Sequence, residues 1–223
     1  MGVTTKHSYY QKGNLKRLSE LGVHAPGSYK SFFTFNDEAL AEGRLSTKLK
    51  ELIAVAVAHV TGCAYCIDLH VSAVKEAGAT KEEVSEAIFV ATALKAGSAI
   101  AHGINALNSY DEIDDEEYYK QAYLKRLSEF STISEDAFNS FIEFDQAALK
   151  SGVIPAREKE LIAVAVAHVT GCPYCIDLHV KAAKKAGVTK EELAEAIFVA
   201  VALKAGSALA HSVNAFAAFD DGE

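Results

Sequence analysis

One stretch of twenty residues occurs twice in this chain, and the repetition limits the folds that the chain can adopt. Residues 51–70 read ELIAVAVAHVTGCAYCIDLH, and residues 160–179 repeat them with Ala64 changed to Pro173. A shift of 109 residues matches 45 of the 60 positions from Glu51 to Tyr110. The 223-residue chain is therefore predicted to be two tandem copies of one unit, covering residues 1–110 and 111–223.

Each unit carries the sequence signals of consecutive helices. In the first unit we expect helices from Pro26 to about Gly43, from Ser46 to about Val60, and from the first cysteine to Gly78, because proline favours a first turn and glycine follows a last one. Residues 52–60 could also be read as a buried strand, but their alanines favour a helix.

A fourth helix is predicted to start after Thr80, where Thr-Lys-Glu-Glu fits a capping box. We expect it to break at Gly97-Ser98 before a last helical segment. Phe32, Phe35, Phe89 and their copies are expected in the core. No stretch alternates long enough to predict a strand, so the fold class is all-α, with two tandem helical units.

The composition of the chain argues against several classes of partner. The net charge of −8 and the pI of about 5.5 disfavour a nucleic-acid or anionic-membrane surface. The first twenty residues are polar and lack a signal-like apolar segment. The longest apolar run, residues 52–60, is too short to cross a bilayer. We therefore expect a cytoplasmic protein without membrane or nucleic-acid partners.

The four cysteines of the chain form two Cys-x-x-Cys pairs, Cys63 with Cys66 and Cys172 with Cys175. On an α-helix, Cys63, Cys66 and His70 would fall within roughly a 60° arc of one face. Cysteines three residues apart can form a reversible disulfide. A helix N-terminus stabilises a thiolate, and a nearby histidine can accept its proton. The spacing thus favours redox chemistry.

Glu51 is a candidate proton carrier, because on its helix it shares a face with small apolar residues. A carboxylate held beside apolar side chains can shuttle a proton near neutral pH. The alternative is an ion pair with Lys48, one turn earlier, which is Arg157 in the second unit.

The spacing Glu, eleven residues, Cys-x-x-Cys, three residues, His resembles the signature of the alkylhydroperoxidase D group in the carboxymuconolactone decarboxylase superfamily. The resemblance covers most of both units and includes the helical context. It implies a thiol-dependent peroxidase, whereas the decarboxylases that name the superfamily typically lack the cysteine pair. A better-known member of the group has one degenerate half, but both halves are intact here.

The resemblance also implies the role of each site residue. Cys66 and Cys175 would be the peroxidatic cysteines, and Cys63 and Cys172 their resolving partners and proton donors. The proton relay would consist of Glu51, His70, Glu160 and His179. The implied partners are a small hydroperoxide and a dithiol reductant of lipoyl or thioredoxin type, with no cofactor. Single-unit relatives often form hexamers, so we expect a homo-oligomer, most simply a trimer.

Other readings of the cysteines are weaker. Cys-Pro-Tyr-Cys is also the glutaredoxin tetrapeptide, but that fold needs a βαβ context and a later proline, which this chain lacks. Two Cys-x-x-Cys pairs could share a zinc ion, although each pair here continues into a helix. The motif could also survive as scaffold in an oligomer. A general dithiol–disulfide oxidoreductase needs the same cysteine cycle and stays the main functional alternative.

Several further polar residues are expected to be structural. His59 and His168 precede the cysteine pairs, and His102 and His211 lie on the last helix of each unit. For these histidines we expect hydrogen-bonded core or interface positions. Asp68 and Asp177 are expected on a solvated face.

Overall fold

The computed structural model describes residues 10–220, and every regular element in that range is a helix. The predicted all-α class is therefore confirmed there. The first unit contains η1 (Lys12–Arg17), α1 (Leu18–His24), α2 (Pro26–Leu40), α3 (Thr47–Thr61), α4 (Ala64–Glu76) and α5 (Lys81–Tyr110). The second contains η2 (Gln121–Arg126), α6 (Leu127–Ile133), α7 (Glu135–Leu149), α8 (Ala156–Thr170), α9 (Pro173–Lys185) and α10 (Lys190–Asp220).

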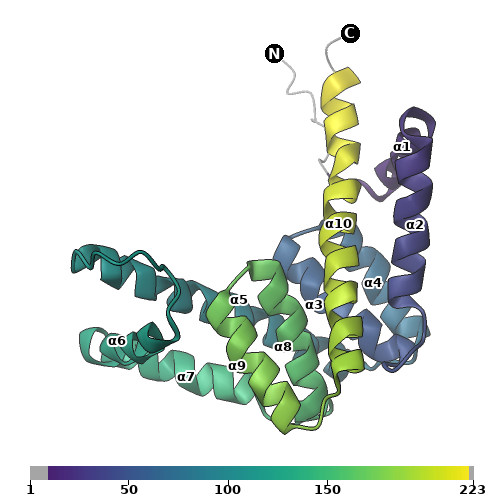
Figure 1. The fold of residues 1–223 in the computed structure, drawn as a ribbon. Coiled ribbons are helices and arrows are strands. Elements are labelled where there is room, and N and C mark those ends of the chain that lie inside the picture. Colours follow the sequence, from purple (N-terminus) through teal and green to yellow (C-terminus); the bar gives the residue numbers. More distant parts are fainter. Residues whose placement is uncertain (1–9, 221–223) are drawn as a thin grey trace, which may run out of the picture.

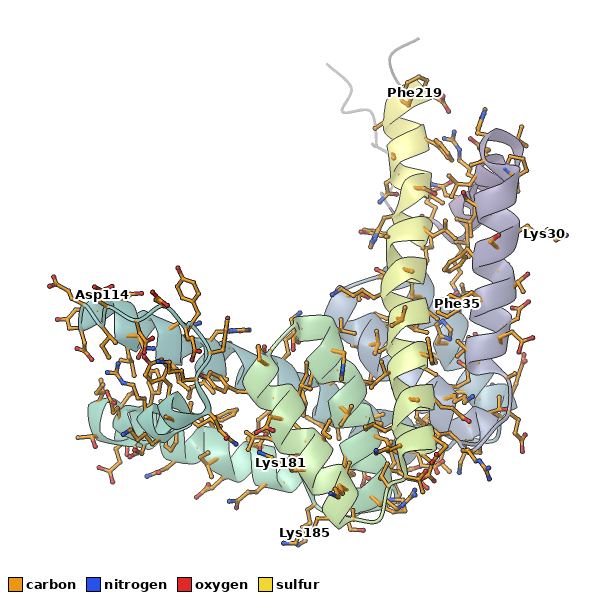
Figure 2. The ribbon with its side chains drawn as sticks, in the orientation of Figure 1. Lys30, Phe35, Asp114, Lys181, Lys185 and Phe219 are labelled. Atoms are coloured by element: carbon orange, nitrogen blue, oxygen red, sulfur yellow. A yellow bond between two sulfur atoms is a disulfide. The ribbon has the colours of Figure 1, made fainter. Side chains whose placement is uncertain are left out.

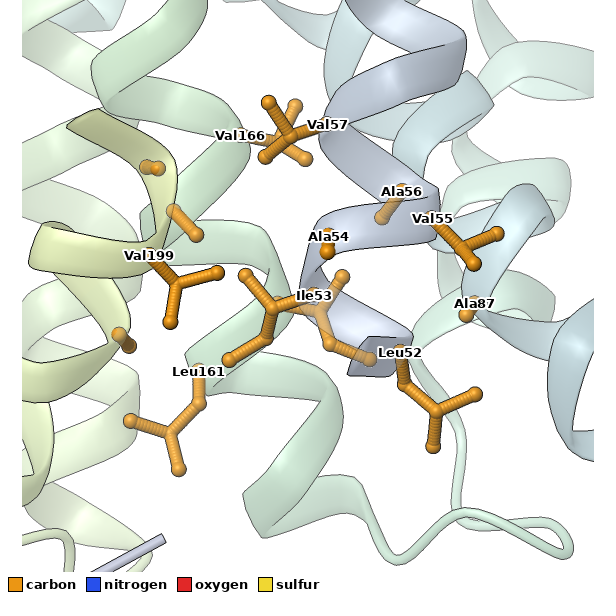
Figure 3. Packing of buried hydrophobic residues seen from close by; sticks show 14 of the residues in the cluster. Leu52, Ile53, Ala54, Val55, Ala56, Val57, Ala87, Leu161, Val166 and Val199 are labelled. Carbon is orange, nitrogen blue, oxygen red and sulfur yellow. The ribbon is translucent and has the colours of Figure 1, made fainter. Parts of the chain in front are cut away.

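The two copies of the alanine-rich helix, α3 and α8, form the centre of the molecule. They pack against each other and against both long helices, α5 and α10. Ile53, Leu161 and Val199 are fully buried where α3, α8 and α10 meet (Figure 3). The buried alanines of α3 and α8 let these helices approach closely, so one continuous core serves both units.

The long last helix of each unit packs against its own unit and also extends along the other. α10 contacts η1, α1 and α2, and α5 contacts η2, α6 and α7. Figure 1 shows the result as two arms, with α1 and α2 beside α10 and with α6 and α7 beside α5. The repeats are therefore intertwined rather than laid side by side.

The predicted break at Gly97-Ser98 is wrong, because α5 continues through it for thirty residues. Gly97 instead lies against another helix: a Cβ at this position would be 3.7 Å from the ring of Phe141 on α7. Its copy Gly206 faces Phe32 on α2 in the same way, at 3.5 Å. The glycine allows the aromatic ring to approach the helix, and packing offsets its cost of about 1 kcal/mol in a helix.

The aromatic residues expected in the core are placed less deeply than predicted. Phe89 is 56% exposed and its copy Phe198 is 54% exposed, so neither is a core residue. Phe35 is half-buried and points from α2 towards α10, whereas Lys30 points into solvent (Figure 2). The ring of Phe35 meets that of Phe198 edge-on at 6.4 Å. These two rings therefore bury apolar surface in the contact between the units.

Helix boundaries agree well with the sequence signals. Ser46 caps α3 by accepting the N–H of Leu49. The predicted capping box is present, since the Thr80 hydroxyl accepts the N–H of Glu83 and the Glu83 carboxylate accepts the N–H of Thr80. These local bonds satisfy N–H groups that a helix start leaves unpaired.

α5 and α10 also have the length and apolar composition of membrane-crossing helices. The mean hydropathy of their most apolar 18-residue windows is 1.4 and 1.7, and 44% and 39% of those windows are buried inside the protein. Core helices of soluble proteins satisfy the same criteria, so this is weak evidence for a membrane. The longest uninterrupted apolar run did not reveal either helix, because Lys95 or Lys204 and the uncharged polar residues and glycines beyond it divide their apolar stretches.

Candidate active site

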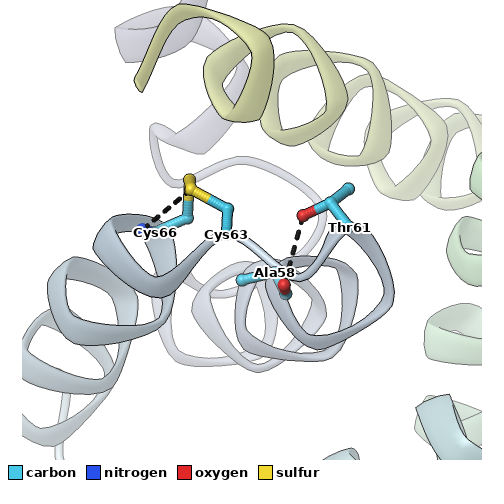
Figure 4. The surroundings of a disulfide bond; sticks show 4 residues. All are labelled: Ala58, Thr61, Cys63 and Cys66. Atoms are coloured by element: carbon cyan, nitrogen blue, oxygen red, sulfur yellow. Dashed lines mark hydrogen bonds between the residues drawn. A yellow bond between two sulfur atoms is a disulfide. The ribbon is translucent and has the colours of Figure 1, made fainter. Parts of the chain in front are cut away.

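The cysteine pair of the first unit begins where α3 ends. Gly62 has a φ of +70°, in the left-handed region that glycine adopts without strain, and it turns the chain into α4. Thr61 donates its hydroxyl hydrogen to the carbonyl of Ala58 across this turn (Figure 4). Gly171 makes the same turn in the second unit, with a φ of +69°.

Cys63 is the N-cap of α4 rather than part of the helix. Its sulfur accepts the N–H of Cys66 at 3.1 Å, as an N-cap oxygen would (Figure 4). Cys172 caps α9 in the same way, at 3.3 Å from the nitrogen of Cys175. The predicted arc of Cys63, Cys66 and His70 on one helix is therefore wrong at its first member, whose backbone is extended.

The two pairs are in different redox states in this structure. Cys63 and Cys66 are joined by a disulfide with their Cα atoms 5.2 Å apart, while Cys172 and Cys175 are free thiols. Cys63 and Cys172 are fully buried, and their partners are each 5% exposed. The same helix start accommodates both the oxidised and the reduced pair.

The glutamate and histidine of each motif are hydrogen-bonded to each other. Nδ1 of His70 lies 2.8 Å from Oε2 of Glu51, and in the second unit His179 and Glu160 are 2.9 Å apart. Because a carboxylate accepts, Nδ1 carries the hydrogen and Nε2 is left as the basic nitrogen. The alternative pairing of Glu51 with Lys48 does not occur, since Lys48 binds Glu83.

The first site opens into a pocket of about 270 Å³. Cys66, Glu51 and His70 all line it, whereas Cys63 does not. Most other lining residues are apolar, and they come from η1, α1, α2, α4 and α10: Leu15, Leu18, Phe32, Phe33, Asn36, Leu69, Ala73, Ala202, Leu203, Gly206, Leu209 and Ala210. The pocket therefore presents one sulfur and the Glu–His pair to a molecule with an apolar body.

In the reduced pair the two thiols are electrostatically different. The pKa of Cys172 is lowered to about 6, because its sulfur accepts hydrogen bonds from the thiol and the backbone N–H of Cys175. The pKa of Cys175 is raised, because its thiol hydrogen is held by Cys172 and because it is buried. The thiolate therefore forms first on the N-cap cysteine, and Cys175 keeps its proton until a base removes it.

Asp145 on α7 is a site residue that the motif analysis missed. It interacts with His179, Glu160 and Cys175 of the second unit, and burial raises its pKa. The equivalent residue in the first unit is Asn36, which lines the pocket beside Cys66. A comparison of the two repeats outside the motif would have revealed this difference in charge.

The remaining predicted polar residues take structural positions. Nδ1–H of His59 and of His168 donates to the carbonyl one turn earlier, at 2.8 Å in each case. Asp68 is exposed and binds Lys12, while Asp177 is half-buried and binds Lys181. Among residues 10–220, no three His, Cys, Asp or Glu side chains are grouped closely enough to hold a metal ion.

Comparison with known proteins agrees with this arrangement. The model of the carboxymuconolactone decarboxylase family matches residues 26–109 and, again, residues 135–218. The two matches span well over half of the chain. The chain therefore belongs to the carboxymuconolactone decarboxylase family and is a tandem duplication of its domain.

Two curated relatives correspond to a single unit. Uncharacterized protein 4 in the cox locus of Paracoccus denitrificans is 43% identical over 95 residues, which are 43% of this chain and 86% of that protein. An uncharacterized protein of Cupriavidus necator is 36% identical over 84 residues, 38% of this chain and 74% of its own. Neither name states an activity.

One solved structure matches nearly the whole chain. It is a protein from Burkholderia xenovorans LB400 that was proposed to be a gamma-carboxymuconolactone decarboxylase subunit. The TM-score is 0.62, and the match covers 95% of this chain and 97% of the other at 19% identity. At that identity the likeness supports the fold alone.

Proposed function

We propose that this protein is a thiol-dependent hydroperoxide reductase that uses one Cys-x-x-Cys dithiol and one Glu–His pair in each unit. The observation that carries the proposal is that Cys66, Glu51 and His70 line one pocket. A reactive sulfur and a base on the same cavity wall are what peroxide reduction by a thiol requires.

The first step is attack on the peroxide by the second cysteine. Nε2 of His179 accepts the thiol proton of Cys175, and Glu160 stabilises the imidazolium through Nδ1–H. The thiolate attacks the terminal oxygen of ROOH, the O–O bond breaks, and Cys175 becomes a sulfenic acid. The leaving alkoxide takes the proton from His179 and departs as ROH.

The second step closes the disulfide. The Cys172 thiolate attacks the sulfur of Cys175, the S–O bond breaks, and the leaving hydroxide takes a proton to become water. The thiolate required is the one that the N-cap position favours. An external dithiol then reduces the disulfide by exchange and is itself oxidised to a disulfide.

The pocket favours particular substrates. Its apolar lining includes Phe32, Phe33 and Leu203, and its only charged groups are those of the Glu–His pair. A hydroperoxide with an alkyl or aromatic body would bury apolar surface there, at about 25 cal/mol per Å². We therefore expect bulky organic hydroperoxides to be reduced better than hydrogen peroxide.

A general dithiol–disulfide oxidoreductase is the second candidate. The low pKa of Cys172 favours it, because a stabilised thiolate is a good leaving group in exchange with any disulfide. It would not need the Glu–His pair to line a pocket beside the second cysteine, and for this reason we prefer the peroxidase.

The deciding experiment measures cumene hydroperoxide consumption with dihydrolipoamide or reduced thioredoxin as donor, beside an insulin-reduction assay. We expect peroxide turnover that is absent from the Cys66→Ser, Cys175→Ser double variant. Insulin reduction without peroxide turnover would select the second candidate. Peroxide turnover that survives in the double variant would exclude the cysteines as the catalyst.

A further inference from the structure

Each cysteine pair is covered by the last helix of the other unit. Cys172, Tyr174 and Cys175 form a buried cluster with Ala101 and Ile104 of α5, which belongs to the first unit. In the copy, the first unit's pair packs against Ala210 and Val213 of α10. One side of each cysteine pair is therefore formed by a helix of the other unit.

Ser98 and His102 lie one turn apart on α5 and bring polar groups to this contact. Ser98 is 4% exposed, and its hydroxyl is among the groups that lower the pKa of the Cys172 thiol. His102 is half-buried, and a positive charge on its ring attracts the Cys172 thiolate. A hydroxyl buried in an otherwise apolar contact costs free energy unless it is bonded.

The ring of His102 is held in place by a pair of tyrosines from the second unit. Its Nδ1 is hydrogen-bonded to the hydroxyl of Tyr119 at 3.1 Å. The Tyr119 ring in turn meets that of Tyr174, between the two cysteines, edge-on at 5.5 Å. The histidine of one repeat is thereby fixed against the dithiol of the other.

The three equivalent rings lie together at the first site. The ring of His211 on α10 lies 6.3 Å from that of Tyr10, and Tyr10 lies 5.6 Å from Tyr65, between Cys63 and Cys66. Ser207, the copy of Ser98, is 5% exposed. The arrangement therefore occurs at both sites, each time with members from both repeats.

We propose that Ser98 and His102 are positioning residues for Cys172 of the opposite unit, and that Ser207 and His211 act in the same way on Cys63. Each active site then has two sides. Its own unit supplies the glutamate and histidine beside the second cysteine, and the other unit supplies the serine and histidine beside the first.

The role of this second side in the cycle rests on the proposed function. When Cys172 attacks the sulfenic acid, the serine hydroxyl and the histidine hold it as the thiolate. When an external dithiol attacks Cys175 in the disulfide, the Cys175–Cys172 bond breaks and Cys172 leaves with the electron pair, in the same surroundings. A leaving thiolate that is stabilised departs faster.

The titratable groups that face the pair are known from every surrounding element. They are His102 on α5, Asp145 on α7, Tyr174 on α9 itself, Tyr123 on η2 with Tyr119 just before it, and His179 with Glu160 of the same motif. Of these, His102 and Tyr174 act on Cys172, whereas Asp145 acts on Cys175. A substitution at His102 is therefore read most directly at the first cysteine.

A crossed titration tests the assignment without any peroxide. In the reduced Cys63→Ser, Cys66→Ser chain, thiolate absorbance at 240 nm between pH 4 and 8.5 reports Cys172 and Cys175 alone. We expect His102→Gln and Ser98→Ala each to lower the thiolate fraction at pH 6, with His102→Gln shifting the midpoint upward by about one unit, or tenfold. His211→Gln and Ser207→Ala are the matched controls and should leave this midpoint unchanged.

In the reciprocal Cys172→Ser, Cys175→Ser chain the pattern should reverse, with His211→Gln effective and His102→Gln silent. Circular dichroism and thermal unfolding confirm that each variant is folded, and Ser98→Ala, the smaller change, covers a failure of His102→Gln. An unshifted midpoint in both α5 variants would overturn the proposal. The proposal would also be overturned if His211→Gln shifted the midpoint of the Cys172 pair, or if His102→Gln shifted that of the Cys63 pair. Since no substrate is present, neither result depends on whether the protein reduces peroxides.

Discussion

The carboxylate of Glu195 on α10 lies 3.1 Å from Nζ of Lys50 on α3 and joins the two repeats. It also accepts the backbone N–H groups of Arg44 and Leu45, in the loop before α3. Lys50 is only 3% exposed, and its other bond is to the carbonyl of Ala41. Glu86 and Lys159 make the same contact in the reverse direction.

Glu195→Gln should destabilise the protein substantially, because it leaves the Lys50 ammonium buried without its counter-charge. Removing one partner of a buried pair costs about 3–5 kcal/mol. Urea unfolding of the variant measures the loss. Glu191→Gln, on the exposed side of the same helix, is the control and should stay within about 0.5 kcal/mol of the parent. A similarly small change at Glu195 would mean that the Lys50 ammonium does not depend on this carboxylate as its counter-charge.

Glu51→Gln should slow peroxide reduction at the first site while leaving the fold intact. Studied in the Cys172→Ser, Cys175→Ser chain, the substitution removes the charge that stabilises the His70 imidazolium, and kcat/KM should fall by about 10² or more. Lys48→Gln is the control, because Lys48 binds Glu83 and not the site. An unchanged pH–rate profile in Glu51→Gln would assign the Glu–His bond a structural role only.

The two cysteines of a pair should differ in sulfenic-acid trapping. With Cys63→Ser the acid formed on Cys66 has no resolving thiol, so it should persist and react with a dimedone probe. With Cys66→Ser no acid should form in that unit. Mass spectrometry of the labelled peptide measures both, and equal labelling of the remaining sulfur in the two variants would contradict the assignment of roles.

The two sites should contribute additively to turnover. Cys66→Ser removes one site and Cys175→Ser the other, so the activities left in the two variants should sum to that of the parent and vanish in the double variant. Steady-state peroxidase assays of the three variants test this. If one single variant retained almost nothing, the loss of one dithiol would have disabled both sites.

Asp145→Asn should stabilise the protein at neutral pH and have little effect in acid. Burial raises the pKa of this carboxyl in the folded state above its ordinary value of 3.8. Stability is therefore lost as the pH rises through that interval, and the loss persists at higher pH. Removing the charge should recover up to about 1.4 kcal/mol for each unit of the shift. Urea unfolding at pH 3 and pH 7 gives the difference.

The first unit offers the reciprocal substitution as a control. Asn36→Asp places a carboxyl where the second unit has one, and it should introduce the same loss of stability at pH 7. If neither substitution changes the free energy of unfolding at either pH, solvent reaches the Asp145 carboxyl. Burial would then not raise its pKa.

Local features of this structure were readable in the sequence because local physics determines them. The Thr80 capping box and the turn at Gly62 each involve a few consecutive residues. The family resemblance implied that glutamate and histidine act together, and the structure adds the hydrogen bond that joins them across two helices. By contrast, the exchange of α5 and α10 was not predictable, because an apolar helix face does not specify which copy of a repeat it will cover. Gly97 was misread for the same reason: its partner, Phe141, lies in the other unit.

Because α5 and α10 each contribute to the site of the other unit, the two repeats of the sequence do not correspond one to one to the two sites. When two identical single-unit chains pair, a change in the gene appears at both sites at once. Here a change in one repeat enters the two sites at different places, beside the second cysteine of one pair and beside the first cysteine of the other. Asn36 and Asp145 already make the two sites of this chain different in charge. If the gene were cut between the repeats, each of the two products would carry part of both sites. Neither product would carry a complete site.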